Sequence, residues 1–235
     1  MIIKDLHNHT IYSDGRLTPE EVFSIAEAKG YQAGISDHCG EGSFQINRDI
    51  QFKQYLNELD KWPVLRSVEL DLGTEIAISA RLLQECDYLI GGIHSLGELN
   101  FFDNAAGLPD AEKIIGQMLD LIERKSQQFE FHILAHPGLL PVALRSHKEK
   151  ILGKEWSQRL VELALKYDFA LEISSRWELP SIDTIKVALN AGAMFSLGSD
   201  GHCQDSTCNL KYSLAVVDQL KIPEKRIFAG KRSAG

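Results

Sequence analysis

The run Asp5-Leu6-His7-Asn8-His9-Thr10-Ile11-Tyr12-Ser13-Asp14-Gly15 is preceded by two apolar residues at positions 2 and 3 and by Lys4. Residues 2–6 are typical of a short buried strand. Since side chains two positions apart in a strand share one face, we expect Asp5, His7 and His9 to point the same way. Two imidazoles on one strand face can bind a single metal ion, and Asp14 adds a carboxylate nearby. A single His-x-His pair is weak evidence of a metal site. It becomes informative only if other strands also end in metal-binding residue types.

The length of 235 residues suits one large α/β domain, and no low-complexity segment, repeat or linker divides it. We therefore expect a single domain over residues 1–235. The formal net charge of -8 argues against an extended nucleic-acid surface. No apolar run reaches the length of a membrane span, and the N-terminus lacks a signal-peptide pattern. The four cysteines have no disulfide-framework spacing, so we predict a cytoplasmic protein with reduced thiols.

Strand-like and helix-like segments alternate along the rest of the chain. The first helix has a clear beginning, because Thr18 and Glu21 form a capping box around Pro19. Further strand-like runs cover residues 31–36, 64–70, 88–93, 131–135, 169–173 and 193–197. Further helices are expected over about 49–61, 76–86, 110–128, 156–167, 180–192 and 208–220.

Seven strands that each lead into a helix predict a parallel sheet, and this many units favour a closed barrel over an open doubly wound sheet. The doubly wound alternative is also weakened because no Gly-x-Gly-x-x-Gly follows the first strand. In a barrel of this kind, the carboxyl ends of the strands meet at one rim, where catalytic residues gather.

Residue types that bind metals stand at most of these strand ends: His7, His9, His38, Glu75, His94, His136, Asp200 and His202. Six of the eight histidines of the chain are in this set. Each residue alone is better explained as structural, but random placement is a poor explanation of all of them together. We therefore predict a shared metal cluster at the carboxyl-terminal rim of the barrel.

The strand ends carry short blocks in a fixed order: Asp5-x-His7-x-His9-Thr10, Ser13-Asp14-Gly15, Ser36-Asp37-His38, Gly73-Thr74-Glu75, Gly91-Gly92-Ile93-His94, Ala135-His136-Pro137-Gly138 and Gly198-Ser199-Asp200-Gly201-His202. With these blocks, the chain resembles the polymerase and histidinol phosphatase (PHP) family over nearly its whole length. The resemblance implies a distorted seven-stranded (β/α)7 TIM-like barrel that holds two to three divalent metal ions.

The resemblance also implies which side chains hold each ion. The first ion is expected at His7, His9, Glu75 and Asp200. The second would share Glu75 as a bridge and add His94 and His136, and the third would use Asp14, His38 and His202. Mixed imidazole and carboxylate ligands suit zinc, manganese and iron, so the identity of the metals stays open. Some relatives have a histidine where Asp14 stands, and the harder carboxylate favours manganese or iron over zinc at the third site, or partial filling.

Such a cluster implies a metal-dependent phosphatase acting on a small phosphorylated substrate. Divalent ions lower the pKa of a bound water and neutralise phosphate oxygens, so we expect in-line attack of a metal-bound hydroxide on a phosphomonoester. Glu75 and Asp200 would take part through the metal ions. Arg176, just past the sixth strand, is the expected grip on the phosphate because a guanidinium fork matches phosphate geometry. Arg16 is the weaker candidate for that role.

Two acidic residues next to the expected ligands leave two interpretations open. Asp5 shares the strand face of His7 and either orients that imidazole or is bonded to backbone. Asp37 precedes His38 and either supports the metal site or belongs to a turn.

Several functions compete with a general small-molecule phosphatase. Within the family, histidinol phosphate and short nucleotides are alternative substrates. A metal-dependent amide hydrolase on a similar barrel usually carries a metal-bridging lysine at a strand end, and none is found here. A non-catalytic metal-binding or nuclease-accessory module is the alternative of another class. The complete set of expected ligands and the acidic charge argue against it.

Overall fold

The computed structural model of the protein describes residues 2–103 and 109–230. Its main element is a sheet of seven strands in the order β1-β2-β3-β4-β7-β8-β9. These strands are β1 Lys4–Asp5, β2 Gln32–Cys39, β3 Leu65–Asp71, β4 Ile90–Gly92, β7 Ile133–Leu134, β8 Ala170–Ser174 and β9 Phe195–Gly198. Every neighbouring pair in this sheet is parallel, as the alternation of strands and helices predicts.

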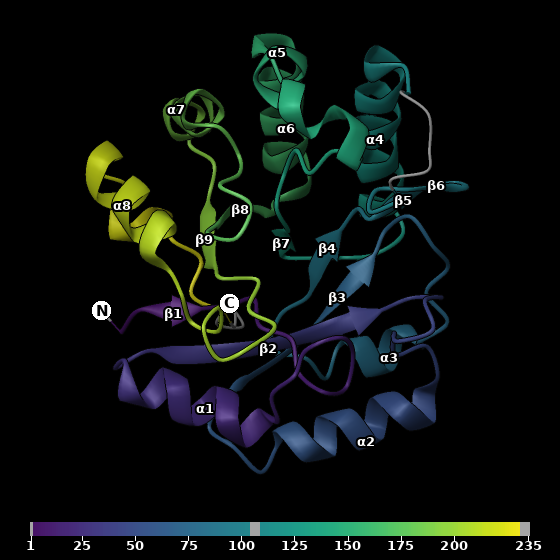
Figure 1. Cartoon of the computed structure of the whole chain (residues 1–235), viewed down its shortest axis with the longest axis vertical. Coiled ribbons are helices and arrows are strands. Elements are labelled where there is room, and N and C mark those ends of the chain that lie inside the picture. The colour runs from purple at the N-terminus through teal and green to yellow at the C-terminus, as the bar shows by residue number, and fades with distance from the viewer. Residues whose placement is uncertain (1, 104–108, 231–235) are drawn as a thin grey trace.

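The two edges of the sheet, β1 and β9, approach each other and nearly close a barrel. The backbone N–H of Leu6 donates to the carbonyl oxygen of Leu197 over 3.0 Å, and Asn8 and Gly201 form a parallel bridge further along. Figure 1 shows the segments that follow β1 and β9 side by side near the middle of the molecule. The predicted distorted seven-stranded TIM-like barrel is therefore confirmed.

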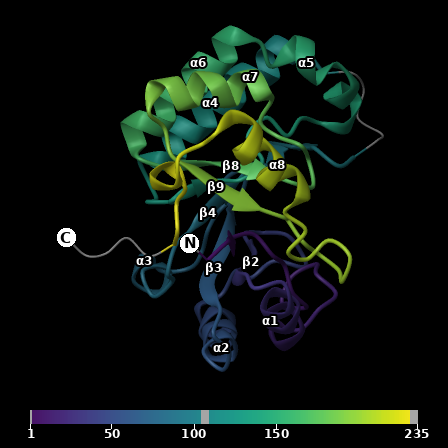
Figure 2. The ribbon, with the colours of Figure 1, turned by 90° about the vertical axis from the view of Figure 1, so that its left-hand side faces the viewer.

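The helices lie outside the sheet. They are α1 Pro19–Ala28, α2 Asp49–Leu59, α3 Ala80–Leu83, α4 Ala111–Ser126, α5 Lys148–Ile151, α6 Lys154–Tyr167, α7 Ile182–Ala191 and α8 Lys211–Leu220. Figures 1 and 2 show α1 and α2 together on one side of the molecule and α4, α6 and α7 together on the opposite side. The capping box of α1 forms as predicted, since Thr18 Oγ1 accepts the N–H of Glu21 and Glu21 Oε2 accepts the N–H of Thr18.

The helix expected over 76–86 is much shorter in the structure, where only α3 is helical. Asp49 Oδ1 accepts the backbone N–H of Ser79 over 2.9 Å, so that the chain before α3 is held against α2 rather than wound into a helical turn. This hydrogen bond joins residues that are 30 positions apart, and hydrophobic periodicity does not reveal such tertiary contacts.

The segments between the predicted strands and helices contain some regular structure. A short antiparallel hairpin follows β4, with strands β5 Ser95–Leu96 and β6 Leu99–Asn100. Residues 104–108, which come later in the sequence than β6, lie outside the described residues. The loop after β7 holds a 3-10 helix over Val142–His147 and then α5, and a second 3-10 helix over Glu224–Arg226 follows α8.

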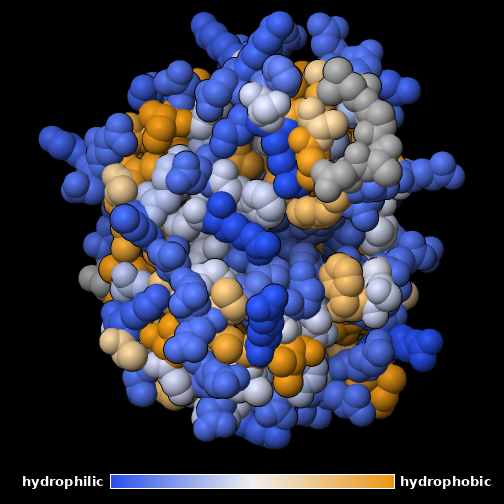
Figure 3. Space-filling view, in the orientation of Figure 1, coloured by the Kyte–Doolittle hydropathy of each residue, from blue (hydrophilic) through white to orange (hydrophobic). Residues whose placement is uncertain are grey.

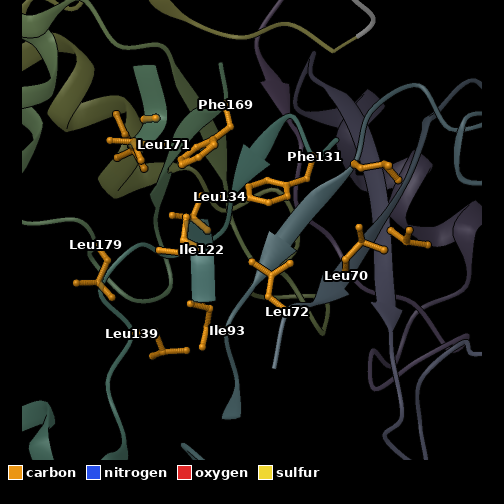
Figure 4. Packing of buried hydrophobic residues seen from close by; sticks show 14 of the residues in the cluster. Leu70, Leu72, Ile93, Ile122, Phe131, Leu134, Leu139, Phe169, Leu171 and Leu179 are labelled. Atoms are coloured by element: carbon orange, nitrogen blue, oxygen red, sulfur yellow. The ribbon is translucent and has the colours of Figure 1, made fainter. Parts of the chain in front are cut away.

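The apolar core has two parts. The larger part packs the sheet against the helices, and Figure 4 shows Ile122 of α4 against Leu134 of β7 within it. The smaller part includes Ile90 and Ala170. These two residues share a strand face with Gly92 and Glu172 but lie two positions closer to the amino ends of β4 and β8. The barrel interior is therefore apolar toward the amino ends of the strands. Toward their carboxyl ends it has room for polar side chains.

The face of the molecule in Figure 3 is largely hydrophilic. Figure 3 shows hydrophobic residues as separate small patches on the face that it displays. None of the helices in the described part of the chain combines the length and the apolar character needed to cross a membrane.

Candidate metal centre

The strands deliver the predicted imidazoles and two of the predicted carboxylates to one rim of the barrel. Donor atoms within 4.8 Å of one another form three groups: His9 with Asp14, His38 and His202; His7 with His9 and Glu69; and His38 with Glu69 and His94. His136 Nε2 lies 3.0 Å from Glu69 Oε1, and Asp200 Oδ1 lies 3.2 Å from His9 Nε2. Side chains from opposite ends of the sequence thus meet because the carboxyl ends of parallel strands share a rim.

The prediction that Glu75 is the bridging metal ligand is wrong. Glu75 is exposed in the segment after β3, and its carboxylate lies outside the three groups found among the described residues. Glu69, which is fully buried on β3, occupies the centre instead. The physical reason is strand length, since β3 continues to Asp71 and its alternation turns Glu69 and Asp71 inward before the chain reaches Glu75. A glutamate inside a buried strand was the signal for this residue in the sequence.

The two oxygens of Glu69 face different imidazoles. Oε2 lies 3.0, 3.4 and 3.7 Å from nitrogens of His38, His7 and His9, respectively. Oε1 lies 3.0 and 3.4 Å from Nε2 of His136 and His94, respectively. Burial alone would raise the pKa of Glu69, but the surrounding imidazoles outweigh burial and hold this pKa well below its usual range. The centre of the cluster is therefore an ionised carboxylate.

Several atoms of the cluster lack the partners that buried polar atoms need. Within the described chain, His9 Nδ1 and His94 Nδ1 are buried without a hydrogen-bond partner, and the 3.0 Å contact between His38 Nδ1 and Glu69 Oε2 lacks the alignment of a hydrogen bond. Imidazole nitrogens also face each other, with 3.0 Å between Nε2 of His7 and His9 and 3.3 Å between Nε2 of His94 and His136. A shared proton would serve one such contact but not the whole set. Divalent cations would supply partners to the facing Nε2 atoms and to Glu69 Oε2, so the residues fit a metal cluster.

The carboxylates toward the open side are also ionised. Asp14 Oδ1 lies 3.2 Å from His202 Nε2 and 3.5 Å from His38 Nε2, and these imidazoles lower the pKa of Asp14 despite its partial burial. Burial would raise the pKa of Asp200, but the hydrogen bond with His9 and the neighbouring imidazoles hold it well below its usual range.

Arg176 lies beside the cluster, just beyond β8. Its Nη1 is 2.6 Å from His202 Nδ1 and 3.5 Å from Asp200 Oδ1, and its side chain is 40% exposed. Arg176 also lines the cavity into which the cluster opens. Arg16, by contrast, is exposed and is not part of that lining. The structure thus brings Arg176 to the site and leaves Arg16 outside it.

The cavity has a volume of about 540 Å³. The aromatic rings of Phe44, Phe102 and Trp177 line it together with polar groups such as Gln45 and Asn100. Clefts of this size suit a small organic molecule whose polar end is fixed by a few well-placed groups.

Trp177 contributes to the site in a way that its sequence position does not reveal. Its Nε1–H donates to Asp200 Oδ2 over 2.6 Å, which leaves Asp200 Oδ1 toward His9. The guanidinium carbons of Arg145 and Arg176 lie 5.0 and 5.1 Å from the Trp177 ring. The indole therefore fixes one oxygen of Asp200 while two cations stack on its ring.

The structure also decides between the interpretations of Asp5 and Asp37. Asp5 accepts hydrogen bonds from Ser199 and from the backbone N–H of His7, and does not contact the His7 ring. Asp37 accepts the N–H and hydroxyl of Thr10 and the hydroxyl of Ser13. Both residues therefore hold the backbone segments that carry ligands. The acceptor of the His7 ring is a residue that the sequence did not indicate, Glu172.

Comparison with known proteins agrees with this geometry. A family model described as PHP domain matches residues 5–176 of the chain. A probable histidinol-phosphatase of Clostridium acetobutylicum is 26% identical over 98% of both chains. A probable phosphatase of Proteus mirabilis is 25% identical over 95% of this chain and 88% of its own length.

A solved structure with the same fold is histidinol phosphate phosphatase from Lactococcus lactis, in complex with zinc, L-histidinol and phosphate. It matches with a TM-score of 0.69 at 17% identity, over 97% of this chain and 96% of that one. At this identity the match shows that the two chains share a fold.

Proposed function

Because the chain belongs to the PHP domain family, we propose that it is a metal-dependent phosphatase that hydrolyses a phosphomonoester of a small molecule. The observation that carries the proposal is the buried, ionised Glu69 with imidazoles on both of its oxygens. The names of the two relatives, a probable histidinol-phosphatase and a probable phosphatase, support the same class of reaction.

We assign two to three divalent ions to this cluster. The proposed ligands share a place on the rim and are His7, His9, Asp14, His38, Glu69, His94, His136, Asp200 and His202. Glu69 takes the bridging role that Glu75 was expected to have, because a carboxylate with separate partners on each oxygen can be shared by two ions.

The chemistry of the site divides between the ions and the side chains. When bound, divalent ions acidify a coordinated water and neutralise phosphate oxygens. The guanidinium of Arg176 is placed to contact the phosphate from the open side of the cluster. The rings of Phe44, Phe102 and Trp177 surround the organic part of the substrate and keep water away from it. Trp177 also keeps Asp200 turned toward the cluster.

The decisive experiment measures hydrolysis of p-nitrophenyl phosphate by chelated protein to which zinc, manganese or iron is returned one at a time. Glu69→Gln is expected to lose metal and to lower kcat/KM by about 100-fold or more, because the variant removes the charge that two ions share. Glu75→Gln is the matched control, since it changes the same side chain at an exposed position. Equal activity of the two variants would contradict the proposal, as would a wild type that takes up metal and hydrolyses no ester.

The substrate is a finer question, for which we propose histidinol phosphate as the first candidate. The support is the match to a probable histidinol-phosphatase over 98% of both chains. A panel of phosphorylated metabolites that includes histidinol phosphate and short nucleotides tests this choice. A kcat/KM for histidinol phosphate well above the others would support it, and equal rates on all esters would reject a dedicated substrate. Binding of metal without turnover on any ester would favour the non-catalytic alternative.

We further propose that residues 1–235 act as one domain in the cytoplasm. Cys39, Cys86, Cys203 and Cys208 are all free in the structure, which is the state that a reducing compartment maintains.

A further inference from the structure

We propose that Glu172 is a positioning residue that orients two of the proposed metal ligands, His7 and His136, at the same time. This inference rests on the proposed metal cluster and adds a residue that does not itself contact the ions. Glu172 lies on β8 with 1% of its surface exposed, and both of its oxygens are used within the barrel.

The first oxygen of Glu172 determines which nitrogen of His7 faces the cluster. Glu172 Oε1 lies 2.6 Å from His7 Nδ1, a distance typical of a charge-assisted hydrogen bond. Both oxygens of Glu172 act as acceptors, Oε2 for the His136 N–H and Oε1 for His7, so the proton of this bond sits on Nδ1. His7 Nε2 points at Glu69 Oε2, 3.4 Å away, and at His9, and in the neutral ring with its proton on Nδ1 this Nε2 is the unprotonated nitrogen. A neutral imidazole with a bare Nε2 is the form that binds a metal ion.

The second oxygen of Glu172 holds the backbone at His136. Glu172 Oε2 accepts the N–H of His136 over 2.6 Å. His136 has a φ of +30°, a left-handed conformation that is uncommon for a residue with a side chain. The hydrogen bond from its N–H therefore helps to keep the turn after β7 in the conformation that brings His136 Nε2 to Glu69 Oε1.

The position of β8 in the sheet explains how one carboxylate reaches both histidines. β8 lies between β7 and β9 in the sheet (Figure 1). β7 leads to His136, and on the other side of β8 the strand β9 approaches β1. To reach His7 after β1, the Glu172 side chain must cross β9, and it does so over Gly198. A Cβ at Gly198 would overlap Glu172 Oε1 and would come within 2.9 Å of His7 Cβ. Glycine at this point of β9 is thus what leaves room for the carboxylate.

Two substitutions test whether Glu172 positions His7 and His136 or only contributes to the stability of the fold. Glu172→Gln keeps the shape of the side chain, but its amide has one oxygen for two N–H donors. Either one contact is lost, or His7 Nδ1 accepts from the amide and the ring proton moves to Nε2, the nitrogen that faces the cluster. Gly198→Ala keeps the carboxylate and its charge but pushes Glu172 from its place. The matched controls are Glu75→Gln, at an exposed glutamate, and Gly116→Ala, where a Cβ would meet no described atom within 4 Å.

The experiment measures zinc affinity by competition with a chromophoric chelator and checks folding of the apo variants by circular dichroism. Glu172→Gln and Gly198→Ala are expected to weaken zinc binding by about 10- to 100-fold, while the two controls stay within about twofold of wild type. Wild-type zinc affinity in a folded Glu172→Gln protein would overturn the inference.

A second measurement uses the wild type and so does not depend on any variant folding. In zinc-loaded protein with ¹⁵N-labelled histidine, the His7 ring is expected to carry a solvent-protected proton on Nδ1. A proton on Nε2 instead would overturn the inference. A wild type that binds zinc with this tautomer but hydrolyses no ester would contradict only the proposed phosphatase function. A wild type that takes up no metal at all would contradict both.

Discussion

Arg176 is the side chain that gives the site a fixed positive charge on its open side. Its Nη1 lies 2.6 Å from His202 Nδ1 and 3.2 Å from the carbonyl oxygen of Asp200, so the guanidinium is tied to the segment that follows β9. The Trp177 ring, 5.1 Å from the guanidinium carbon, holds it from another side. A guanidinium held in this way is prepared to contact a phosphate without first losing conformational freedom.

Replacement of Arg176 by alanine is therefore expected to lower kcat/KM for p-nitrophenyl phosphate by about 10- to 100-fold, the range for a lost hydrogen bond to a charged group. Lysine at this position should recover only part of the loss, because it keeps the charge but not the fork. Steady-state kinetics of both variants test this expectation. Arg16→Ala serves as the control, since Arg16 is exposed and outside the cavity lining. A loss of the same size in the Arg16 variant would exclude a specific role for Arg176.

Glu69 and Glu172 each lie across a glycine of the neighbouring strand. Glu69 on β3 leans toward β4, where a Cβ at Gly92 would overlap Glu69 Oε1 and come within 2.9 Å of His94 Cε1. Glu172 on β8 leans over Gly198 of β9 in the same way. Glycine normally weakens a strand, and here it permits a charged side chain to lie flat across the next strand.

Gly92→Ala is expected to displace Glu69 and to lower the bound zinc per chain, although the substituted residue is itself no metal donor. Gly116→Ala, in the middle of α4, is the opposite case, because its Cβ would enter open space and alanine favours a helix. We expect that control to keep its zinc and to gain up to about 1 kcal/mol in the free energy of unfolding. Elemental analysis and urea denaturation measure the two quantities. Full zinc content in a folded Gly92→Ala protein would show that Glu69 does not depend on this glycine.

The proposed metal ligands link distant parts of the barrel. The proposed ligands extend from His7 after β1 to His202 after β9, and they come from every strand of the main sheet except β8, which supplies Glu172. The two sheet edges themselves are joined by few hydrogen bonds, among them that from Leu6 to Leu197. Ions that bind donors on both sides of this seam should therefore stabilise the closed barrel.

We expect removal of the metal to lower the thermal midpoint of the protein. At a free metal concentration of 100 times Kd, binding contributes about 2.7 kcal/mol to the free energy of unfolding. For a chain of this size, that corresponds to a shift of about 5–10 °C. Thermal melts of wild type with zinc and with chelator measure the shift, and Glu69→Gln should show little of it. Identical midpoints for wild type with bound zinc and without it would contradict the coupling between metal and fold.

The alternation of strands and helices, and with it the parallel barrel, could be predicted from the residue order alone. The residue order also predicts that the histidines share one rim, because His7, His38, His94, His136 and His202 stand at strand ends and parallel strands place those ends together. These predictions depend only on order and spacing along the chain, which local patterns report directly.

Asp14 and Asp200 could be predicted from the sequence as well, but the glutamate at the centre of the cluster could be identified only in the folded chain. Glu69, Asp71 and Glu75 follow one another in and after β3, and the choice among them depends on where the strand ends and how it is staggered against its neighbours. Glu172 and Trp177 reach their partners across strands that are remote in sequence. Spacing along one strand specifies a shared face, but contacts between strands are set by packing, and packing is a property of the folded chain.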